Sequence, residues 1–272
     1  LAVVYPAAGN LGGGGFMMLR PPGQPSIFFD FREKAPLAAT ADMYLDSKGN
    51  VIPDLSVLGW KAVAVPGTVA GLDAVHARWG HLPRQVIMEP AIKLARDGFM
   101  LGEGDVELLH TSTAALAKDP YARKIFLRPD GSPFQPGDRL VQKDLAHSLE
   151  LIARNGADAF YKGPIAATIL AQSKAHGGIL QAEDFERYKP RELPPITCSY
   201  RGPLVETAPP PSPRGMALSA MLQLRAGYDM PALGPPPHPP VQHRTEPTRR
   251  PFPDRPHLAD PHLPHTPPRH PP

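Results

Sequence analysis

The sequence predicts a mixed α+β fold over residues 1–230, followed by a proline-rich tail over residues 231–272. Short apolar runs bounded by Pro and Gly turn signals alternate with segments whose apolar residues recur at helical spacing. The 272 residues are 42% hydrophobic and 20% charged, so the body can bury a sizeable core. Hairpin signals between neighbouring runs argue against a doubly wound parallel sheet.

Two pairs of strands are expected. Residues 16–19 and 26–31 are apolar runs, and Pro21-Pro22-Gly23 between them is a strong turn signal, so they predict a hairpin. Residues 196–200 and 203–207 predict a second pair in the same way.

Helices are expected where apolar residues at helical spacing lie between a start and a stop signal. The first follows a short apolar strand at residues 62–65 and has Thr68 as its N-cap, and the second has Pro83 at its first position. The expected helices span about 68–78, 83–97, 145–155, 164–176 and 214–226.

The tail differs from the body in composition. Residues 231–272 hold 16 of the 38 prolines and 6 of the 11 histidines, and they contain no Ile, Met, Trp, Tyr or Lys. Such a segment cannot bury enough apolar surface to form a core. We therefore expect the tail to be disordered or to be corrupted sequence.

Charge and cysteine usage exclude several classes of protein. The net charge of +3 is +2 in the tail and +1 in the body, and no basic stripe interleaved with aromatic residues predicts a nucleic-acid partner. The lone Cys198 allows neither an intramolecular disulfide nor a cysteine metal site. The tail histidines match no ligand spacing, so we expect no metal and no cofactor. No run of 18 apolar residues predicts a membrane-spanning helix.

The chain begins at Leu1 inside an apolar run, so we expect a fragment from which a signal peptide could be missing.

The run Gly12-Gly13-Gly14-Gly15 is the most conspicuous segment of the sequence. A phosphate-binding loop would need Lys-Ser/Thr after the last glycine, where Phe16-Met17 stands, and the dinucleotide fingerprint also fails. We therefore expect a tight turn that enters a buried strand, with glycines that permit positive φ or close approach of another group.

Arg32 is the candidate binding residue. It lies at the end of an apolar strand in Asp30-Phe31-Arg32-Glu33, where a guanidinium can hold a carboxylate through two parallel hydrogen bonds. The alternative is an ion pair with Asp30, Glu33 or a distant acid. The residues alone leave both open.

These segments resemble the gamma-glutamyltranspeptidase family. The resemblance is carried by Asn10-Leu11-Gly12-Gly13-Gly14-Gly15-Phe16-Met17, by Asp30-Phe31-Arg32-Glu33, and by residues 5–6, 35–36, 43–46, 65–72, 90–92, 94–95, 98–99, 137–140, 158–163, 177–178 and 200–202. The segments occur in the family's order over about residues 1–230, and the ordered set is specific.

The resemblance implies an incomplete Ntn-hydrolase fold, a four-layer αββα sandwich of which this chain is the large-subunit part. In the family, the N-terminal Thr of a small subunit from the same precursor attacks the gamma-glutamyl amide of glutathione and other gamma-glutamyl compounds. The acyl group then passes to water, an amino acid or a peptide. The resemblance assigns Arg32 to the glutamyl α-carboxylate, places the catalytic Thr beyond this chain, and implies a periplasmic or secreted protein.

The sequence departs from the family at two places. The family's Pro-Pro-Pro-Ser-Ser-Gly-Gly is here Pro209-Pro210-Pro211-Ser212-Pro213-Arg214-Gly215, and prolines stand at 251 and 253 where alanine is usual. A helix over residues 249–255 should therefore not form. We expect the chain alone to be inactive. The alternative is a catalytically inactive α/β binding or scaffold protein that keeps the fold.

Overall fold

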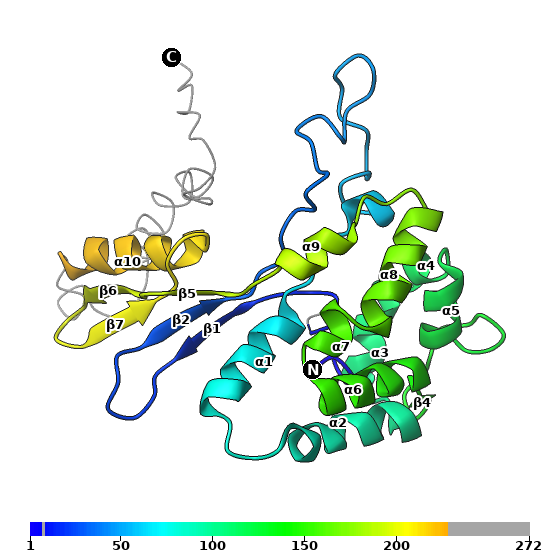
Figure 1. Ribbon diagram of the computed structural model, residues 1–272, viewed down its shortest axis with the longest axis horizontal. Helices are drawn as coiled ribbons and strands as arrows, with labels where there is room; N and C mark the ends of the chain where they lie inside the picture. Colours follow the sequence, from blue (N-terminus) through cyan, green and yellow to red (C-terminus); the bar gives the residue numbers. More distant parts are fainter. Residues whose placement is uncertain (7–8, 228–272) are drawn as a thin grey trace, which may run out of the picture. The chain divides into compact units, whose positions relative to one another are not determined.

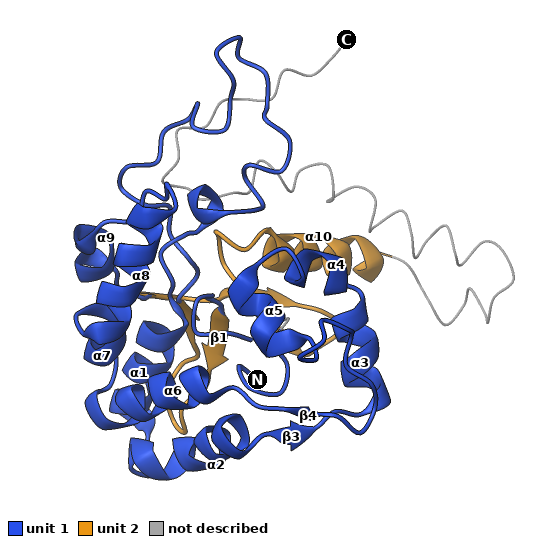
Figure 2. Cartoon of the chain, turned by 90° about the vertical axis from the view of Figure 1, so that its right-hand side faces the viewer, with its two compact units in different colours: residues 1–15, 31–190 blue, residues 16–30, 191–272 orange. Residues whose placement is uncertain are grey.

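The structure is a computed structural model that describes residues 1–6 and 9–227 (Figure 1). The predicted tail at 231–272 and the helix excluded at 249–255 lie outside the described residues. The described chain forms two compact units (Figure 2). Unit 1 holds Leu1–Gly15 and Phe31–Pro190, and unit 2 holds Phe16–Asp30 and the chain from Arg191 onward.

Unit 2 contains both predicted strand pairs, and it also contains β5, which was not predicted. Strands β1 (Phe16–Leu19), β2 (Ile27–Asp30) and β5 (Arg191–Leu193) form an antiparallel sheet in the order β1-β2-β5, and the predicted β1–β2 hairpin is confirmed. Strands β6 (Ile196–Ser199) and β7 (Leu204–Thr207) form the second predicted pair.

Helix α10 (Pro213–Ala226) packs on β6 and β7 (Figure 1). The departures from the family motif fit this helix. Pro213 is in the first turn of α10, where a main-chain N–H would have no partner within the helix, so the N–H that proline lacks is not missed. The Arg214 side chain is exposed. Gly215 is buried, and a Cβ there would lie 1.9 Å from the Ala208 carbonyl oxygen.

Unit 1 is mainly helical. Its elements are η1 (Trp60–Ala62), α1 (Thr68–Trp79), α2 (Arg84–Asp97), β3 (Phe99–Met100), α3 (Glu103–His110), α4 (Thr113–Leu116), α5 (Pro120–Phe126), β4 (Arg139–Leu140), α6 (Lys143–Asn155), α7 (Asp158–Tyr161), α8 (Pro164–Ala175) and α9 (Ala182–Arg187). Strands β3 and β4 pair antiparallel. The core helices agree with the predicted ranges to within one or two residues, whereas α3, α4, α5, α7 and α9 were not predicted.

Two apolar clusters hold unit 1 together. Helices α2 and α6 pack along their length through Ile92, Ala95 and Leu149, which are buried in one cluster. The other cluster contains Phe160 and Phe185 from α7 and α9, both at most 2% exposed. Burial of such side chains contributes about 1.5–3 kcal/mol each, so these contacts fix the helices around the site.

The first helix begins differently from the prediction. Thr68 is its first helical residue and Gly67 is the N-cap, without a side-chain cap. A Cβ at Gly67 would lie 2.0 Å from the Phe31 carbonyl oxygen and 2.1 Å from the Tyr188 hydroxyl. Tertiary crowding therefore excludes the side chain that an N-cap would normally supply.

Two other local predictions were wrong in detail. Pro83 is the N-cap of α2 and not its first helical residue. The expected strand at residues 62–65 is reduced to one antiparallel bridge between Val65 and Lys34: Ala62 belongs to η1, and Val63 and Ala64 belong to no helix or strand.

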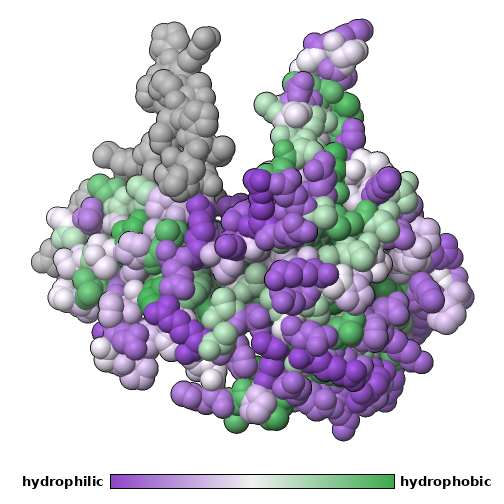
Figure 3. All heavy atoms as spheres, viewed as in Figure 1, coloured by the Kyte–Doolittle hydropathy of each residue, from purple (hydrophilic) through white to green (hydrophobic). Residues whose placement is uncertain are grey.

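No helix in the described part of the chain has the length and apolar character that crossing a membrane requires. The face in Figure 3 mixes hydrophilic and hydrophobic residues over both the helices and the strands.

Candidate functional site

The glycine run docks on the N-terminus of α1. The Gly13 carbonyl oxygen accepts hydrogen bonds from the amides of Gly67 (2.8 Å) and Thr68 (3.0 Å). A Cβ at Gly14 would lie 2.6 Å from the Phe31 carbonyl oxygen, so Gly14 is needed for the close approach of two chain segments. This half of the prediction is confirmed.

The other half of the glycine prediction was wrong. Positive φ occurs at other glycines of the described chain, such as Gly23 and Gly156, but not at Gly12–Gly15. The strand that follows, β1, alternates exposed and half-buried residues and is not buried. Gly14 and Gly15 are needed because a side chain there would collide with residues 31–33, whereas a Cβ at Gly12 would meet only Asn10 Oδ1, at 3.7 Å.

Phe31 is the anchor of the segment that carries Arg32. Its amide and carbonyl exchange hydrogen bonds with Gly15 (3.0 and 3.2 Å), and the residue is 6% exposed. A Cβ at Gly71 of α1 would lie 2.2 Å from Phe31 Cγ, and one at Gly15 would lie 3.0 Å from Cε2. Two glycines thus make the space that this ring fills.

Arg32 follows directly and has an exposed side chain. Its carbonyl oxygen accepts a hydrogen bond from the Tyr188 hydroxyl at 2.8 Å. Further along, the Lys34 amide donates to the Val65 carbonyl (3.1 Å) and the Val65 amide returns the bond (2.8 Å). The backbone that carries Arg32 is therefore held on both sides.

Asp30, two residues before Arg32, belongs to a charge pair within unit 2. The Asp30 carboxylate, 4% exposed, accepts hydrogen bonds from Arg191 Nε (3.0 Å) and Nη2 (2.6 Å). This charge-assisted pair ties β2 to β5.

Two stacked tyrosines bind the backbone at different places, Tyr188 at Arg32 and Tyr161 at Pro66. The rings of Tyr161 and Tyr188 stack with centroids 5.6 Å apart and 12° between planes. The Tyr161 hydroxyl donates to the Pro66 carbonyl (2.7 Å), immediately before the N-cap of α1. Burial raises the pKa of Tyr161 well above its ordinary value, so this hydroxyl stays a donor at physiological pH.

A cavity of about 700 Å³ opens beside the glycine run. Its wall is mostly apolar and comes from Phe31, the glycines and helices α1, α2 and α6. Its charged side chains include Asp73 and Arg84, whose Oδ1 and Nη2 lie 2.6 Å apart. Asp73 Oδ2 also accepts the Ala157 amide (3.1 Å), so this pair ties α1 and α2 to the start of α7.

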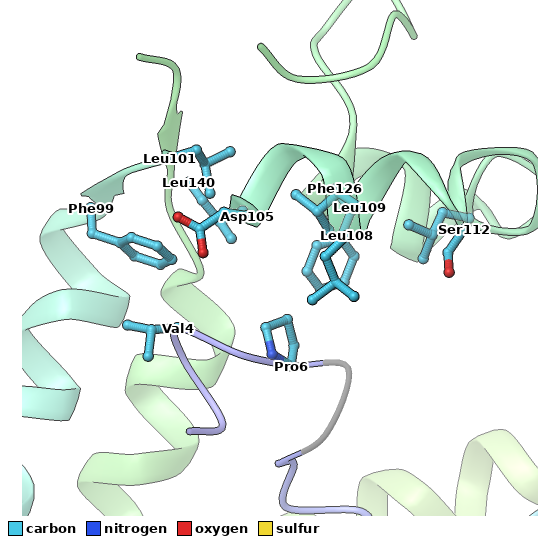
Figure 4. A pocket seen from close by; sticks show the side chains of 11 residues that line it. Val4, Pro6, Phe99, Leu101, Asp105, Leu108, Leu109, Ser112, Phe126 and Leu140 are labelled. Carbon is cyan, nitrogen blue, oxygen red and sulfur yellow. The ribbon is translucent and has the colours of Figure 1, made fainter. Parts of the chain in front are cut away.

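A smaller cavity of about 170 Å³ lies elsewhere in unit 1 (Figure 4). It is lined by apolar side chains such as Phe99, Leu108 and Leu140, and by the polar side chains of Asp105 and Ser112 (Figure 4). The Asp105 carboxylate accepts the Gly102 amide at 2.9 Å and so caps α3. The Asp105 carboxylate therefore has a structural role.

Within residues 1–6 and 9–227, no three His, Cys, Asp or Glu side chains come together as metal ligands would. The tail histidines lie outside the described residues. Cys198 is a free, buried thiol in β6.

The chain is similar in sequence and in structure to known proteins. The sequence model of gamma-glutamyltranspeptidase matches residues 1–269. The chain is 51% identical over 234 residues to a glutathione hydrolase proenzyme from Pseudomonas sp. (strain A14), covering 86% of this chain and 41% of that one. The corresponding Escherichia coli (strain K12) proenzyme is 42% identical over 234 residues, covering 86% and 40%. The chain spans about two fifths of the length of these relatives.

A further relative is an Acylase ACY 1 proenzyme from Pseudomonas sp. (strain V22). It is 37% identical over 240 residues, covering 86% of this chain and 43% of that one.

Solved structures agree. Gamma-glutamyltranspeptidase from Helicobacter pylori superposes with a TM-score of 0.92 at 38% identity, covering 95% of this chain and 74% of that one. The enzyme from Pseudomonas nitroreducens, complexed with L-DON, gives 0.87 at 37% identity, covering 96% and 77%. The fold is therefore the Ntn-hydrolase fold, as the resemblance implied. The chain belongs to the gamma-glutamyltranspeptidase family.

Sequence reasoning found Arg32 and the glycine run but missed Tyr161 and Tyr188. Neither tyrosine stands in a pattern that signals a contact with residues more than 90 positions earlier. Only the packing of α7 and of the segment after α9 against residues 31–34 and 66–70 brings them there.

Proposed function

We propose that this chain is the large-subunit part of an enzyme that transfers or hydrolyses gamma-glutamyl groups. Its substrates are glutathione and other gamma-glutamyl compounds, and its acceptors are water, amino acids or peptides. The partner is a small subunit from the same precursor, whose N-terminal Thr forms the acyl-enzyme. The observation that carries the proposal is family membership over nearly the whole chain.

The identities favour this activity over the related acylases. The first glutathione hydrolase proenzyme is 51% identical, whereas the acylase proenzyme is 37% identical over a similar length. Both relatives are proenzymes by name, which supports a precursor that is processed into subunits. By the same resemblance the protein is periplasmic or secreted, and residues 1–230 form the large-subunit domain.

Arg32 is proposed to bind the glutamyl α-carboxylate. Its side chain is exposed, and its backbone lies between the Phe31–Gly15 and Lys34–Val65 pairings. A bidentate contact would fix which end of the glutamyl group faces the nucleophile, and this is what an exposed guanidinium on a rigid segment does well.

Arg32→Lys in the complete precursor tests this role. Lysine keeps the charge but loses the fork, and a charge-assisted bond of this kind is worth about 1.5–3 kcal/mol. The specificity constant for gamma-glutamyl-p-nitroanilide should fall by about ten- to a hundredfold. Arg20→Lys, at a guanidinium that is 77% exposed, is the matched control and should change it less than twofold.

Normal self-cleavage of both variants must be verified by gel before their rates are compared. If the specificity constant of Arg32→Lys stays within twofold of the parent's, Arg32 is structural and its proposed binding of the glutamyl α-carboxylate is wrong.

The competing proposal is a catalytically inactive α/β binding or scaffold protein that retains the family fold. The complete reading frame separates the two, since the enzyme needs the Thr that becomes the N-terminus of the small subunit. A complete precursor that neither cleaves itself nor turns over substrate would favour the scaffold.

A further inference from the structure

The pairing beside Arg32 stops one step short of it. Lys34 and Val65 form an antiparallel bridge, and in the same register Arg32 would face Gly67 two residues further on. The Gly67 amide, however, donates to the Gly13 carbonyl at 2.8 Å. The ladder therefore ends here, and Gly67 cannot offer its amide to the Arg32 carbonyl.

The Tyr188 hydroxyl supplies a donor at this place. It binds the Arg32 carbonyl oxygen at 2.8 Å. It also lies close to the backbone of Gly67: a Cβ added to Gly67 would be 2.1 Å from the Tyr188 hydroxyl oxygen. A side-chain hydroxyl thus stands where the next main-chain donor of a sheet would be.

The ring of Tyr188 has little freedom to move. It is 7% exposed and stacks on Tyr161. The Lys34 ammonium lies 4.9 Å from the ring centroid and donates to the Lys189 carbonyl at 2.9 Å. Stacking and a cation–π contact together hold the hydroxyl in one place.

We propose that Tyr188 is a positioning residue for Arg32 in substrate binding. The inference rests on the proposed role of Arg32 and deepens it. By fixing the Arg32 carbonyl, Tyr188 fixes the Cα from which the guanidinium projects. A two-point contact depends on both distance and direction, so small displacements of this origin weaken it.

Tyr188→Phe in the complete two-subunit enzyme tests the inference. The ring and its stacking remain, and only the hydroxyl is lost. KM for gamma-glutamyl-p-nitroanilide should rise by about three- to tenfold with kcat within twofold of the parent, because the contact orients the substrate and takes no part in the chemical step.

Tyr161→Phe is the matched control. It removes a buried hydroxyl from the same stacked pair, but this hydroxyl binds Pro66 and not Arg32. It should lower the melting temperature while leaving KM within 1.5-fold. Equal rises of KM in both variants would make the effect one of general packing and would overturn the inference.

A double-mutant cycle with Arg32→Lys separates this inference from the proposed function. If Tyr188 acts through Arg32, Tyr188→Phe should change KM less than twofold in the Arg32→Lys background. Additive effects would refute the positioning role, as would an unchanged KM in Tyr188→Phe when Arg32→Lys is impaired.

Failure of Tyr188→Phe to self-cleave, with Tyr161→Phe processed normally, would make Tyr188 structural and also refute the inference. An inactive parent, or an Arg32→Lys variant that equals the parent, would instead overturn the proposed function on which it rests.

Discussion

Replacing Gly71 with alanine measures how tightly α1 closes on Phe31. The new methyl group would lie 2.2 Å from Phe31 Cγ, 2.4 Å from its Cβ and 2.5 Å from its Cδ1. Carbon atoms normally approach to about 3.5–4.0 Å, so the overlap exceeds about 1 Å. Phe31 has little room to retreat, because Gly15 closes on the other end of the ring.

The magnitude follows from two opposing terms. Overpacking a closed core site costs about 1–3 kcal/mol, while exchanging Gly for Ala in a helix gains up to about 1 kcal/mol. A net loss of about 1–2 kcal/mol is expected. At about 2–4 °C per kcal/mol for a domain of this size, the melting temperature should fall by about 2–8 °C.

Gly104→Ala is the matched control. Gly104 lies in α3, and nothing is found within 4 Å of the Cβ that it would gain. The same substitution should therefore raise the melting temperature by about 1–3 °C, because only the helix propensity changes. Thermal denaturation followed by circular dichroism at one scan rate gives both shifts.

The reasoning is refuted if Gly71→Ala melts at or above the parent. It is also refuted if both variants fall equally, since the loss would then come from replacing a helical glycine and not from the contact with Phe31.

Two further predictions concern the pH dependence and the isolated chain. Hydrogen bonds from the Arg128 guanidinium and the main-chain N–H of Gln135 hold the pKa of Asp138 below its ordinary value. The stability that Asp138 contributes is therefore present above the ordinary carboxyl pKa of 3.8, and it is lost as the pH falls through the lowered pKa of the folded state. Asp138→Asn should therefore lower the melting temperature at neutral pH, with the difference shrinking in scans taken below that carboxyl value; an equal difference at all pH values would contradict this. The 272-residue polypeptide alone should show no release of p-nitroaniline from gamma-glutamyl-p-nitroanilide above a mock-purified control, because the proposed acyl-enzyme needs the small subunit's Thr. Turnover above that control would show that the chain carries a nucleophile of its own.

The local chain signals were sufficient for much of the fold. Pro21-Pro22-Gly23 between two apolar runs predicted the β1–β2 hairpin, and Gly156 marked the end of α6. Turns and helix ends depend on the backbone preferences of a residue and of neighbours a few positions away, so they can be predicted from the local sequence. Short helices such as α4 and α7 escaped prediction, because four residues carry too little periodicity to be recognised.

The candidate site divides in the same way. The sequence by itself determined that Arg32 is a guanidinium at the end of an apolar strand, that the glycine run cannot be a nucleotide loop, and that the ordered motifs resemble one family. Only the tertiary structure shows that a side chain at Gly67 would collide with Phe31 and Tyr188, and that the Tyr188 hydroxyl donates a hydrogen bond to the Arg32 carbonyl. Tyr188 is 156 residues from Arg32, so the contact depends on how the intervening helices pack, and no local preference encodes it.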